Sequence, residues 1–486
     1  MGNSKEKKKQ VSALEQTKIP LQSKLETALE KENAFDFKIR PLTVGGKMAF
    51  CTYIIGYTDS YLLERIHASL LALSPESVNE NPSMQSFMER CLSLPSSEVT
   101  GDVNTASEEV LRGSAALVLE GFDEILLMDV RAFSTRGIKE PEKDRTLRGP
   151  HVGLNESLIS NTVQIRRYLR TETLVSERFL VGNKIKSEVV VLSIKGRGDA
   201  ELLKRIRTKL ENASLPSLSM TQETLANLLF PQKGFFRINP FPRVRYTERP
   251  DVVAATLMEG KIAILCDNSP SVMLLPVTVF DFFEETDDYY FPPLTASYLR
   301  IVRIFIFLCS IFLIPIWLII AKNDISIPDS FRFILADEEF SVPLYLQFLI
   351  IELAIDGLKM ASLNTPNTLS GSFSVIGGLL LGEFAVKSGW FVPQTILYSA
   401  FCSIANFVPS NYELGYAFKF MRISLILLVE PFGVWGLVIG CIFWLILLLS
   451  TRSVAGKHYL SPVFPFDKTG FAKIFIRTAK GKERDF

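Results

Sequence analysis

Histidine is scarce in this chain of 486 residues, and the cysteines are not spaced as in zinc-binding or disulfide motifs. The three histidines are His67, His151 and His458, and none has a cysteine near it in sequence. The six cysteines lie far apart and form no CxxC pair. Zinc sites and disulfide frameworks depend on such spacings, so neither is expected, and we expect reduced, mostly buried thiols.

The signatures of the common enzyme classes are missing as well. The chain has no GxSxG segment and no Walker loop. Catalysis by side chains needs a nucleophile, a base and an orienting group within reach of one another, or a metal cluster. We therefore expect that the protein is not a membrane-anchored hydrolase or transferase, and that it has no catalytic residue, cofactor or metal site.

An excess of charge of either sign is also missing. Lysine and arginine total 53 and aspartate and glutamate total 52, and the formal net charge of +1 gives no nucleic-acid signature. The N-terminal MGNSKEKKKQ is basic, but no apolar run follows it, so no secretory signal peptide is expected. Residues 1–35 are rich in Lys, Glu, Gln and Ser, and we expect a flexible arm there, either disordered or loosely helical.

Long apolar runs, in contrast, fill much of the second half of the chain. The run LRIVRIFIFLCSIFLIPIWLII extends from Leu299 to Ile320, about the length that a helix needs to cross a bilayer. Arg300 and Arg303 lie at its start, where arginines are frequent on the cytoplasmic side and can reach lipid phosphates. Trp317 lies near its end, at a depth that indole rings prefer. We therefore predict a transmembrane helix that begins inside the cell and divides a cytoplasmic half from a membrane half.

The cytoplasmic half contains one pattern twice. A strand, a turn and an amphipathic helix are predicted in KMAFCTYIIGYTDSYLLERIHASLLAL, and VGNKIKSEVVVLSIKGRGDAELLKRIRTKL repeats them, with Asp59 matching Asp199. GSAALVLEGFDEILLMDV and GKIAILCDNSPSVMLLPV form a second matching pair, and each is typical of a β-hairpin. We infer two tandem α/β subdomains of related design that meet near residue 147.

Two basic segments are candidate interfaces. Apolar residues alternate with Arg166, Arg167 and Arg170 in RGPHVGLNESLISNTVQIRRYLRTETL. This pattern indicates either a surface helix with a basic face or a helix that docks on acidic partners or lipid headgroups. NPFPRVRYTERPDV places Arg245 and Arg249 among acids and prolines, which favours a rigid interface loop with a surface ion-pair network.

The next predicted span, PLYLQFLIIELAIDGLKM, carries two acidic residues. Glu352 and Asp356 stand at i and i+4 and therefore share one helical face. Two carboxylates facing lipid would each cost at least ~2.5 kcal/mol, so this face must meet water or protein. Either Asp356 pairs locally with Lys359 near the cytoplasmic end, or the carboxylates form a lining that attracts cations.

A glycine-rich segment, NTPNTLSGSFSVIGGLLLGEFAVKSGWFVP, follows this span. Glycines such as Gly378 in apolar sequence permit close helix packing or re-entrant backbone. Glu383 has Lys387 at i+4 as a ready partner. The last apolar run is interrupted by EPFG at Glu430, so it is either one long kinked helix or a helical hairpin.

The basic tail after Ser450 predicts a cytoplasmic C-terminus, and the number of full crossings is then even. Four crossings with a re-entrant or partial element are favoured, with six as the alternative. The expected fold class is an α/β cytoplasmic region of two tandem related subdomains followed by an all-α polytopic membrane domain. The expected ranges are 1–35 for the arm, 36–146 and 147–290 for the subdomains, 291–460 for the membrane domain and 461–486 for the basic tail.

Several of these segments resemble the GerA family of spore germination proteins, the A subunits of germinant receptors. The resemblance covers roughly residues 37–466 and rests on RGPHVGLNESLISNTVQIRRYLR, NPFPRVRYTERPDV, PPLTASYLRIVR, SVIGGLLLGEFAV and VPSNYELGYAFKF. Within the family, RYTERPDV, DNSPSV and FVPQTILYSA are most similar to an accessory paralogue of the A subunits. The sequence departs from the family at His151, usually a basic residue, and at Glu383, commonly an amide.

The resemblance implies a multi-pass protein of the spore inner membrane that acts in germination. It implies a homo-oligomer in the lipid bilayer that conducts monovalent cations beside other germination membrane proteins or a small membrane partner. We therefore expect a subunit of a cation channel that contributes to ion release and amplifies the germinant response. The alternative is a non-conducting scaffold that assembles receptor components. The candidate pore or gating residues are Glu352, Asp356, Lys359, Gly378, Glu383 and Glu430.

Overall fold

The structure is a computed structural model, in which the chain forms two compact units. It describes residues 19–30, 34–92, 96–132, 141, 144–215, 221–230, 239–322, 334–335, 341–364, 385–406, 408, 411–456 and 458–476. Unit 1 takes in Met1–Arg145, Pro150–Pro231 and Tyr246–Pro276, and unit 2 takes in Thr146–Gly149, Gln232–Arg245 and Val277–Phe486. Each unit has its own core.

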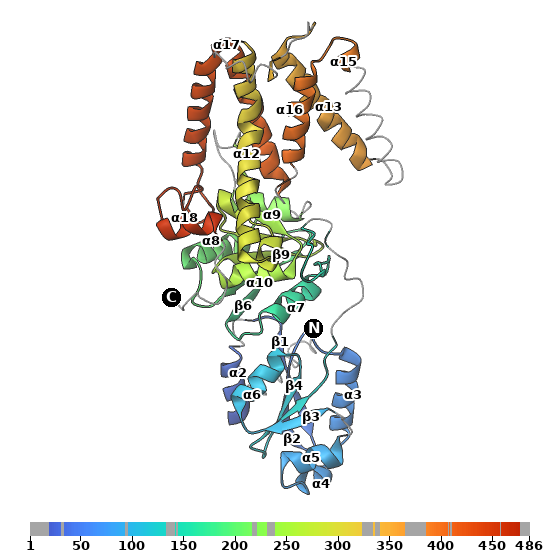
Figure 1. The fold of residues 1–486 in the computed structure, drawn as a ribbon. Coiled ribbons are helices and arrows are strands. Elements are labelled where there is room, and N and C mark those ends of the chain that lie inside the picture. The colour runs from blue at the N-terminus through green and yellow to red at the C-terminus, as the bar shows by residue number, and fades with distance from the viewer. Residues whose placement is uncertain are drawn as a thin grey trace. The chain divides into compact units, whose positions relative to one another are not determined.

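The first sheet of unit 1 has five antiparallel strands in the order β1-β2-β4-β5-β3. They are β1 (Phe37–Val44), β2 (Lys47–Ile54), β3 (Ser97–Thr100), β4 (Ala115–Leu119) and β5 (Ile125–Met128). Its helices are α2 (Pro20–Ala28), α3 (Ser60–Leu71), α4 (Pro75–Asn79), α5 (Met84–Cys91) and α6 (Val103–Leu111). Strand β4 is buried along its whole length, because α3 packs on one face of the sheet and α2 and α6 pack on the other (Figure 1).

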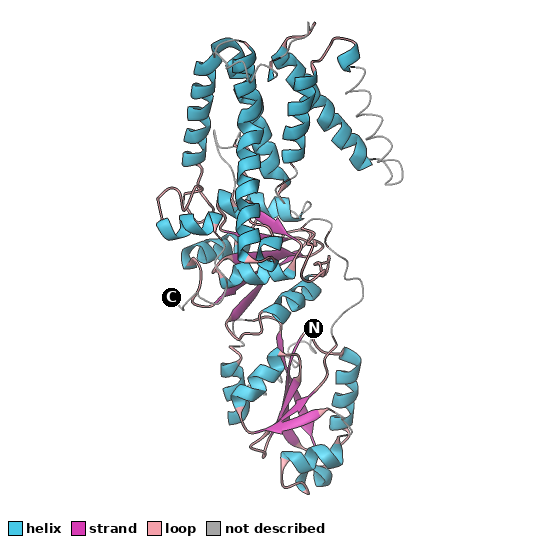
Figure 2. Ribbon diagram, viewed as in Figure 1, coloured by secondary structure: helices cyan, strands magenta, loops and turns pink. Residues whose placement is uncertain are grey.

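The second sheet repeats this arrangement in the order β6-β7-β9-β10-β8. Its strands are β6 (Leu174–Val181), β7 (Ser187–Ile194), β8 (Arg245–Thr247), β9 (Ile262–Cys266) and β10 (Val272–Leu275). Its helices are α7 (Leu158–Tyr168), α8 (Ala200–Glu211), α9 (Thr221–Leu229) and α10 (Pro250–Met258). Figure 2 shows both sheets flanked by helices. The α/β character of this region and its pairs of hairpins are as the sequence predicts, whereas the exact domain boundaries stay predictions. Helix α2 lies within the range 1–35 that was expected to be a flexible arm, but its buried Leu25 packs in the core of the first sheet.

The matched aspartates of the two sequence repeats have the same structural role. Asp59 precedes α3, and its carboxylate accepts from the backbone amides of Tyr61 and Leu62. Asp199 precedes α8 and accepts from the amide of Leu202. Each carboxylate satisfies amides that the first helical turn leaves without a partner, which fixes where the helix begins.

Unit 2 is mainly helical. Its elements are the 3-10 helix η3 (Val279–Phe282) and the α-helices α11 (Asp287–Tyr290), α12 (Pro293–Ala321), α13 (Leu344–Asn364), α15 (Ala385–Lys387), α16 (Pro393–Ala405), α17 (Tyr412–Ser450) and α18 (Lys468–Phe475). Among the described residues, α12 and α17 are the helices long and apolar enough to cross a membrane. Helix α12 begins earlier than the predicted span, at a Pro-Pro pair whose fixed backbone suits a first helical turn.

Helix α17 is a hairpin of two helical arms. Gly433 breaks the helix with φ 53° and ψ −130°, a conformation that only glycine adopts readily, two residues after Pro431. Trp444 in the second arm donates from Nε1 to Ser424 Oγ in the first arm, 2.7 Å away. Of the two alternatives that the sequence leaves open for this run, the structure therefore has the hairpin.

Trp317, near the end of α12, is buried inside unit 2. It is 2% exposed, packs against Phe348 of α13 and Tyr398 of α16, and donates from Nε1 to the carbonyl of Ile334 at 2.8 Å. The indole is therefore part of the core between helices, where its one polar group has a partner.

Candidate functional site

Four charged side chains meet between α13 and the first arm of α17. We call Glu352, Asp356, Lys419 and Arg422 the buried charge cluster. Arg422 Nη2 lies 2.6 Å from Glu352 Oε1, and Lys419 Nζ lies 3.0 Å from Glu352 Oε2 and 2.6 Å from Asp356 Oδ2. Two carboxylates and two cations give the cluster no net charge.

Helix geometry explains why these four residues meet. The acids stand four residues apart on α13 and the bases three apart on α17, so each pair shares one helical face. The two helices run antiparallel, because Glu352 meets Arg422 while Asp356 meets Lys419. A third helix joins through the carbonyl of Ser310 in α12, which accepts from Arg422 Nη1 at 2.9 Å.

The cluster is almost completely enclosed by protein. Glu352 is 2% exposed and Arg422 is fully buried, while the side chain of Asp356 keeps 25% of its surface. Charged groups at such depth are stable only when they are paired, because they have lost their hydration. Asp356 Oδ1 is buried and accepts no hydrogen bond from the described residues. This carboxylate therefore retains an open acceptor position at the more exposed end of the cluster.

Two of the predicted pore residues are not among the four members of this cluster. Lys359 Nζ lies 5.8 Å from the ring centre of Tyr416, and the ion pair of Asp356 is made with Lys419 instead of Lys359. Glu430 lies at the end of the first arm of α17 and pairs with Lys322 at 2.9 Å. Gly378 and Glu383 lie outside the described residues, so their assignment stays a prediction.

Sequence reasoning missed the two bases of the cluster. Lys419 and Arg422 follow VPSNYELGYAF, and no local pattern there indicates a partner for either of them. The structure buries them, at 4% and 0% exposure, because the carboxylates of α13 receive them. The available signal was the match of an i, i+3 basic pair with an i, i+4 acidic pair in two apolar runs.

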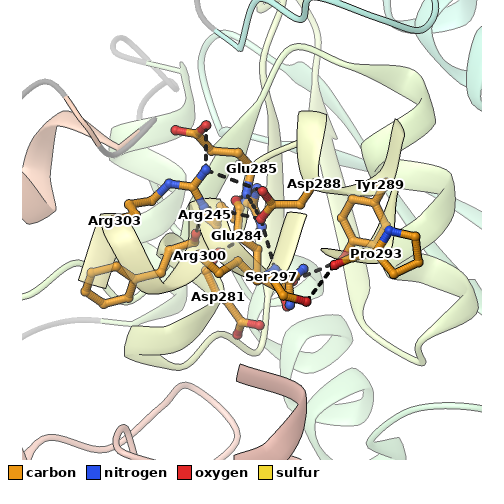
Figure 3. Close-up of polar contacts among 11 residues, drawn as sticks. Arg245, Asp281, Glu284, Glu285, Asp288, Tyr289, Pro293, Ser297, Arg300 and Arg303 are labelled. Carbon is orange, nitrogen blue, oxygen red and sulfur yellow. Dashed lines mark hydrogen bonds and ion pairs between the residues drawn. The ribbon is translucent and has the colours of Figure 1, made fainter. Parts of the chain in front are cut away.

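A second charge cluster fixes the start of α12 (Figure 3). Asp288 of α11 is fully buried and accepts from Arg300 Nε at 3.0 Å and from Arg303 Nη1 at 3.2 Å. Arg300 also pairs with Glu284 at 3.3 Å and Arg303 with Glu285 at 2.9 Å. The expectation that these two arginines reach toward lipid phosphates is wrong, because an acidic segment just before the helix binds them inside the protein.

Arg245 joins this second cluster through backbone carbonyls. Its guanidinium donates to the carbonyls of Asp281 at 2.9 Å and Glu284 at 3.1 Å, and the residue is 9% exposed. Figure 3 shows Arg245 beside the acids that bind Arg300 and Arg303. It holds the turn that presents those acids, which is a structural role within the chain.

The sequence model described as Bacillus/Clostridium GerA spore germination protein matches residues 23–485. The chain belongs to the GerA family. Stage V sporulation protein AF of Bacillus subtilis (strain 168) is 31% identical over 447 residues, which are 92% of this chain and 90% of that relative. Spore germination protein KA of the same organism is 28% identical over 460 residues, 93% of this chain and 83% of the relative.

A solved structure of an N-terminal domain is similar to part of this GerA family chain. It is the N-terminal domain of the A subunit of the Bacillus megaterium spore germinant receptor GerK3, at 24% identity and a TM-score of 0.39. The match covers 52% of this chain and 91% of that domain.

Three of the five arginines proposed as interface residues of this GerA family chain are buried. Besides Arg245, Arg249 is fully buried and binds Asp251 at 2.8 Å, and Arg166 is fully buried and binds Asp36 at 2.6 Å. The expected surface ion-pair network in the proline-rich segment is therefore an internal one. Arg167 in the last turn of α7 and Arg170 just after the helix are exposed, and their interface role stays a prediction.

Proposed function

We propose that this GerA family protein is a subunit of an oligomeric cation channel in the spore inner membrane that contributes to ion release during germination. The observation that carries the proposal is the buried charge cluster, which joins α13 to α17 within apolar helices. The germination and sporulation names of its relatives support the physiological setting.

The energetic cost of the cluster supports conduction over scaffolding. Burying an ion pair costs several kcal/mol of desolvation per ion, and the attraction between the charges often does no better than balance it. Apolar side chains of similar size would hold the same helices together at least as well. A scaffold has no need of these four charges, whereas a cation path needs acidic oxygens at membrane depth.

The ion pairs give the proposed channel a closed state. While Arg422 and Lys419 occupy the carboxylates, the cluster is neutral and offers cations little attraction. On this proposal, movement of the first arm of α17 away from α13 uncovers Glu352 and Asp356, and ring closure of several subunits repeats these acids around one axis. The helices cross the bilayer in several passes with both termini in the cytoplasm, and other germination membrane proteins or a small membrane partner trigger the movement.

The proposal is tested by removing one carboxylate charge at a time. We expect Glu352→Gln and Asp356→Asn to lower the rate of K⁺ release from germinating spores by roughly tenfold, the lower end of what focused negative charge contributes to local cation concentration. Glu188→Gln is the matched control, because Glu188 of β7 also pairs with a cation, Arg178, but lies at the surface and is no pore candidate. Protein levels in isolated spore membranes must be compared for all three variants.

The outcome also decides between the channel and the scaffold. Variants that are present at wild-type levels but release ions slowly support the channel. Wild-type ion release from Glu352→Gln and Asp356→Asn spores would mean that the carboxylates only hold helices together. In that case a non-conducting scaffold for receptor components becomes the better account.

A further inference from the structure

The segment after the last long helix exposes an unusual number of large apolar side chains. Helix α17 ends at Ser450, and in the following 26 residues the side chains of Val463, Phe464, Phe466, Phe471 and Ile476 are exposed, Phe466 by 69%. Phe466 and Phe471 have ring centres 5.7 Å apart, and Phe471 and Phe475 have theirs 5.3 Å apart. Contiguous exposed apolar patches on a folded protein mark surfaces that another phase or molecule covers.

The start of this segment, residues 458–476, is fixed to the rest of unit 2 by hydrogen bonds of Tyr459. Tyr459 is fully buried, donates its hydroxyl to the carbonyl of Pro242 at 2.7 Å, and accepts at its own carbonyl from Val279 at 3.0 Å. His458 packs its ring on Phe464 at 4.9 Å. The aromatic face is therefore preorganised, and α18 lies against the helix α12 (Figure 1).

Charge and position indicate what covers this face. Residues 458–476 contain two lysines and one aspartate, and the sequence that follows, 477–486, adds four basic and two acidic residues. Lys468 begins α18 and is exposed among the aromatic residues. Aromatic side chains next to lysines, directly after the apolar second arm of α17, have the composition of an interfacial element, with rings in the acyl boundary and cations at the headgroups.

We infer that residues 458–476 bind the cytoplasmic surface of an anionic bilayer, with Phe464, Phe466 and Phe471 inserted and Lys468 at the lipid phosphates. The inference rests on the proposed membrane arrangement. It assigns the chain a lipid-binding element beyond its helical spans, one that ties the end of α17 to the membrane surface. An anchored end limits how the hairpin can move, so the lipid charge at this surface would influence the helix that carries Lys419 and Arg422.

The test is hydrogen–deuterium exchange of the full chain in nanodiscs of phosphatidylglycerol, in nanodiscs of phosphatidylcholine, and in detergent. We expect the amides of 468–476 to exchange roughly tenfold more slowly in phosphatidylglycerol than in phosphatidylcholine. Each lysine near an anionic surface contributes about 1 kcal/mol to the free energy of membrane binding. Lys468→Gln with Lys473→Gln should remove this difference, and Phe466→Ser with Phe471→Ser should remove protection in both lipids.

The controls use a similar turn on unit 1. Lys184, Ile185 and Lys186 are exposed between β6 and β7, and their variants Lys184→Gln, Lys186→Gln and Ile185→Ser should leave exchange in 468–476 unchanged. Equal exchange of 468–476 in both lipids and in detergent would overturn the inference. Protection in detergent that rises with protein concentration would also overturn it, because another copy of the chain would then cover the face. Fast exchange throughout 304–320 in nanodiscs would instead show that the proposed membrane arrangement itself fails.

Discussion

Arg422 and Glu352 form a fully enclosed ion pair, with 2.6 Å between Nη2 and Oε1, although 70 positions separate them in the chain. Arg422 also reaches the carbonyl of Ser310, so one guanidinium joins α17, α13 and α12. A pair that binds three helices through charge can hold them in one arrangement and release them in another. This relationship is the basis of the proposed closed state.

Replacing one member of this pair should be far more harmful to stability than replacing both. Arg422→Leu alone leaves Glu352 buried without its main partner and should lower the free energy of unfolding by about 3 to 5 kcal/mol. The double variant Glu352→Leu with Arg422→Leu should be close to wild type in thermal unfolding of the detergent-purified protein. If the double variant is as unstable as the single one, the charges are needed for folding itself.

Asp288 should be essential for the start of α12. Asp288→Asn removes the carboxylate that Arg300 and Arg303 share, and should cost about 3 to 5 kcal/mol because two guanidinium groups stay buried with weaker partners. Glu285→Gln is the matched control, because the Glu285 side chain is 31% exposed, and such a pair is worth about 1 kcal/mol or less. The measurement is the thermal unfolding midpoint of both purified variants. Equal decreases in the midpoint would show that Asp288 contributes no more to stability than Glu285.

The α17 hairpin should depend on glycine at its turn. Gly433→Ala places a side chain on a backbone with φ 53° and ψ −130°, which should cost roughly 1 to 3 kcal/mol or open the hairpin. Gly357→Ala in α13 is the control, because a Cβ there meets open space and alanine favours a helix by about 1 kcal/mol over glycine. A bifunctional thiol cross-linker applied to the double variant Ser424→Cys with Trp444→Cys reports whether the two arms are still together, because the side chains of these two positions meet across the hairpin. Unchanged stability and cross-linking in Gly433→Ala would contradict the described turn.

His67 should make the first subdomain sensitive to mild acid. It is 2% exposed in α3, neither ring nitrogen has a hydrogen-bond partner among the described residues, and burial, with a smaller effect of Arg40, lowers its pKa from 6.5 to about 4. The unfolded chain therefore binds a proton between pH 6.5 and 4 that the folded chain does not, so stability falls as the pH falls through this window.

The same histidine provides its own control. Relative to pH 7, the wild type at pH 5 should lose roughly 1 to 2 kcal/mol more stability than His67→Leu, which has no proton to bind. Urea unfolding of the full chain, followed at both pH values, measures the difference. Identical losses in the two proteins would mean that His67 is protonated in the folded state.

The sequence predicts the α/β region well because its signals are local. Alternating and helical periodicities locate the strands and helices, and the matched Asp59 and Asp199 cap α3 and α8 as their spacing before the helices suggests. Two sheets with the same strand order then follow from two copies of one pattern.

The charged sites are less predictable, because periodicity assigns a residue to a face but not to a partner. Periodicity places Glu352 and Asp356 on one face of a helix, yet their partners Lys419 and Arg422 lie more than 60 positions away in the chain, where no local pattern connects them. Arg300 and Arg303 were assigned to lipid because arginines at the ends of spans commonly lie there. The acids that bind them, from Glu284 to Asp288, stand just before the helix and were the overlooked signal.

The central claim is that this chain conducts cations, and planar bilayers test it most directly. Current is recorded across bilayers containing the purified wild-type protein with its germination partner proteins, and across bilayers containing Glu352→Gln. We predict stepwise cation-selective currents for the wild type and much smaller currents for Glu352→Gln at equal amounts of assembled protein. Bilayers that hold assembled wild-type protein and its partners but stay silent would contradict the account.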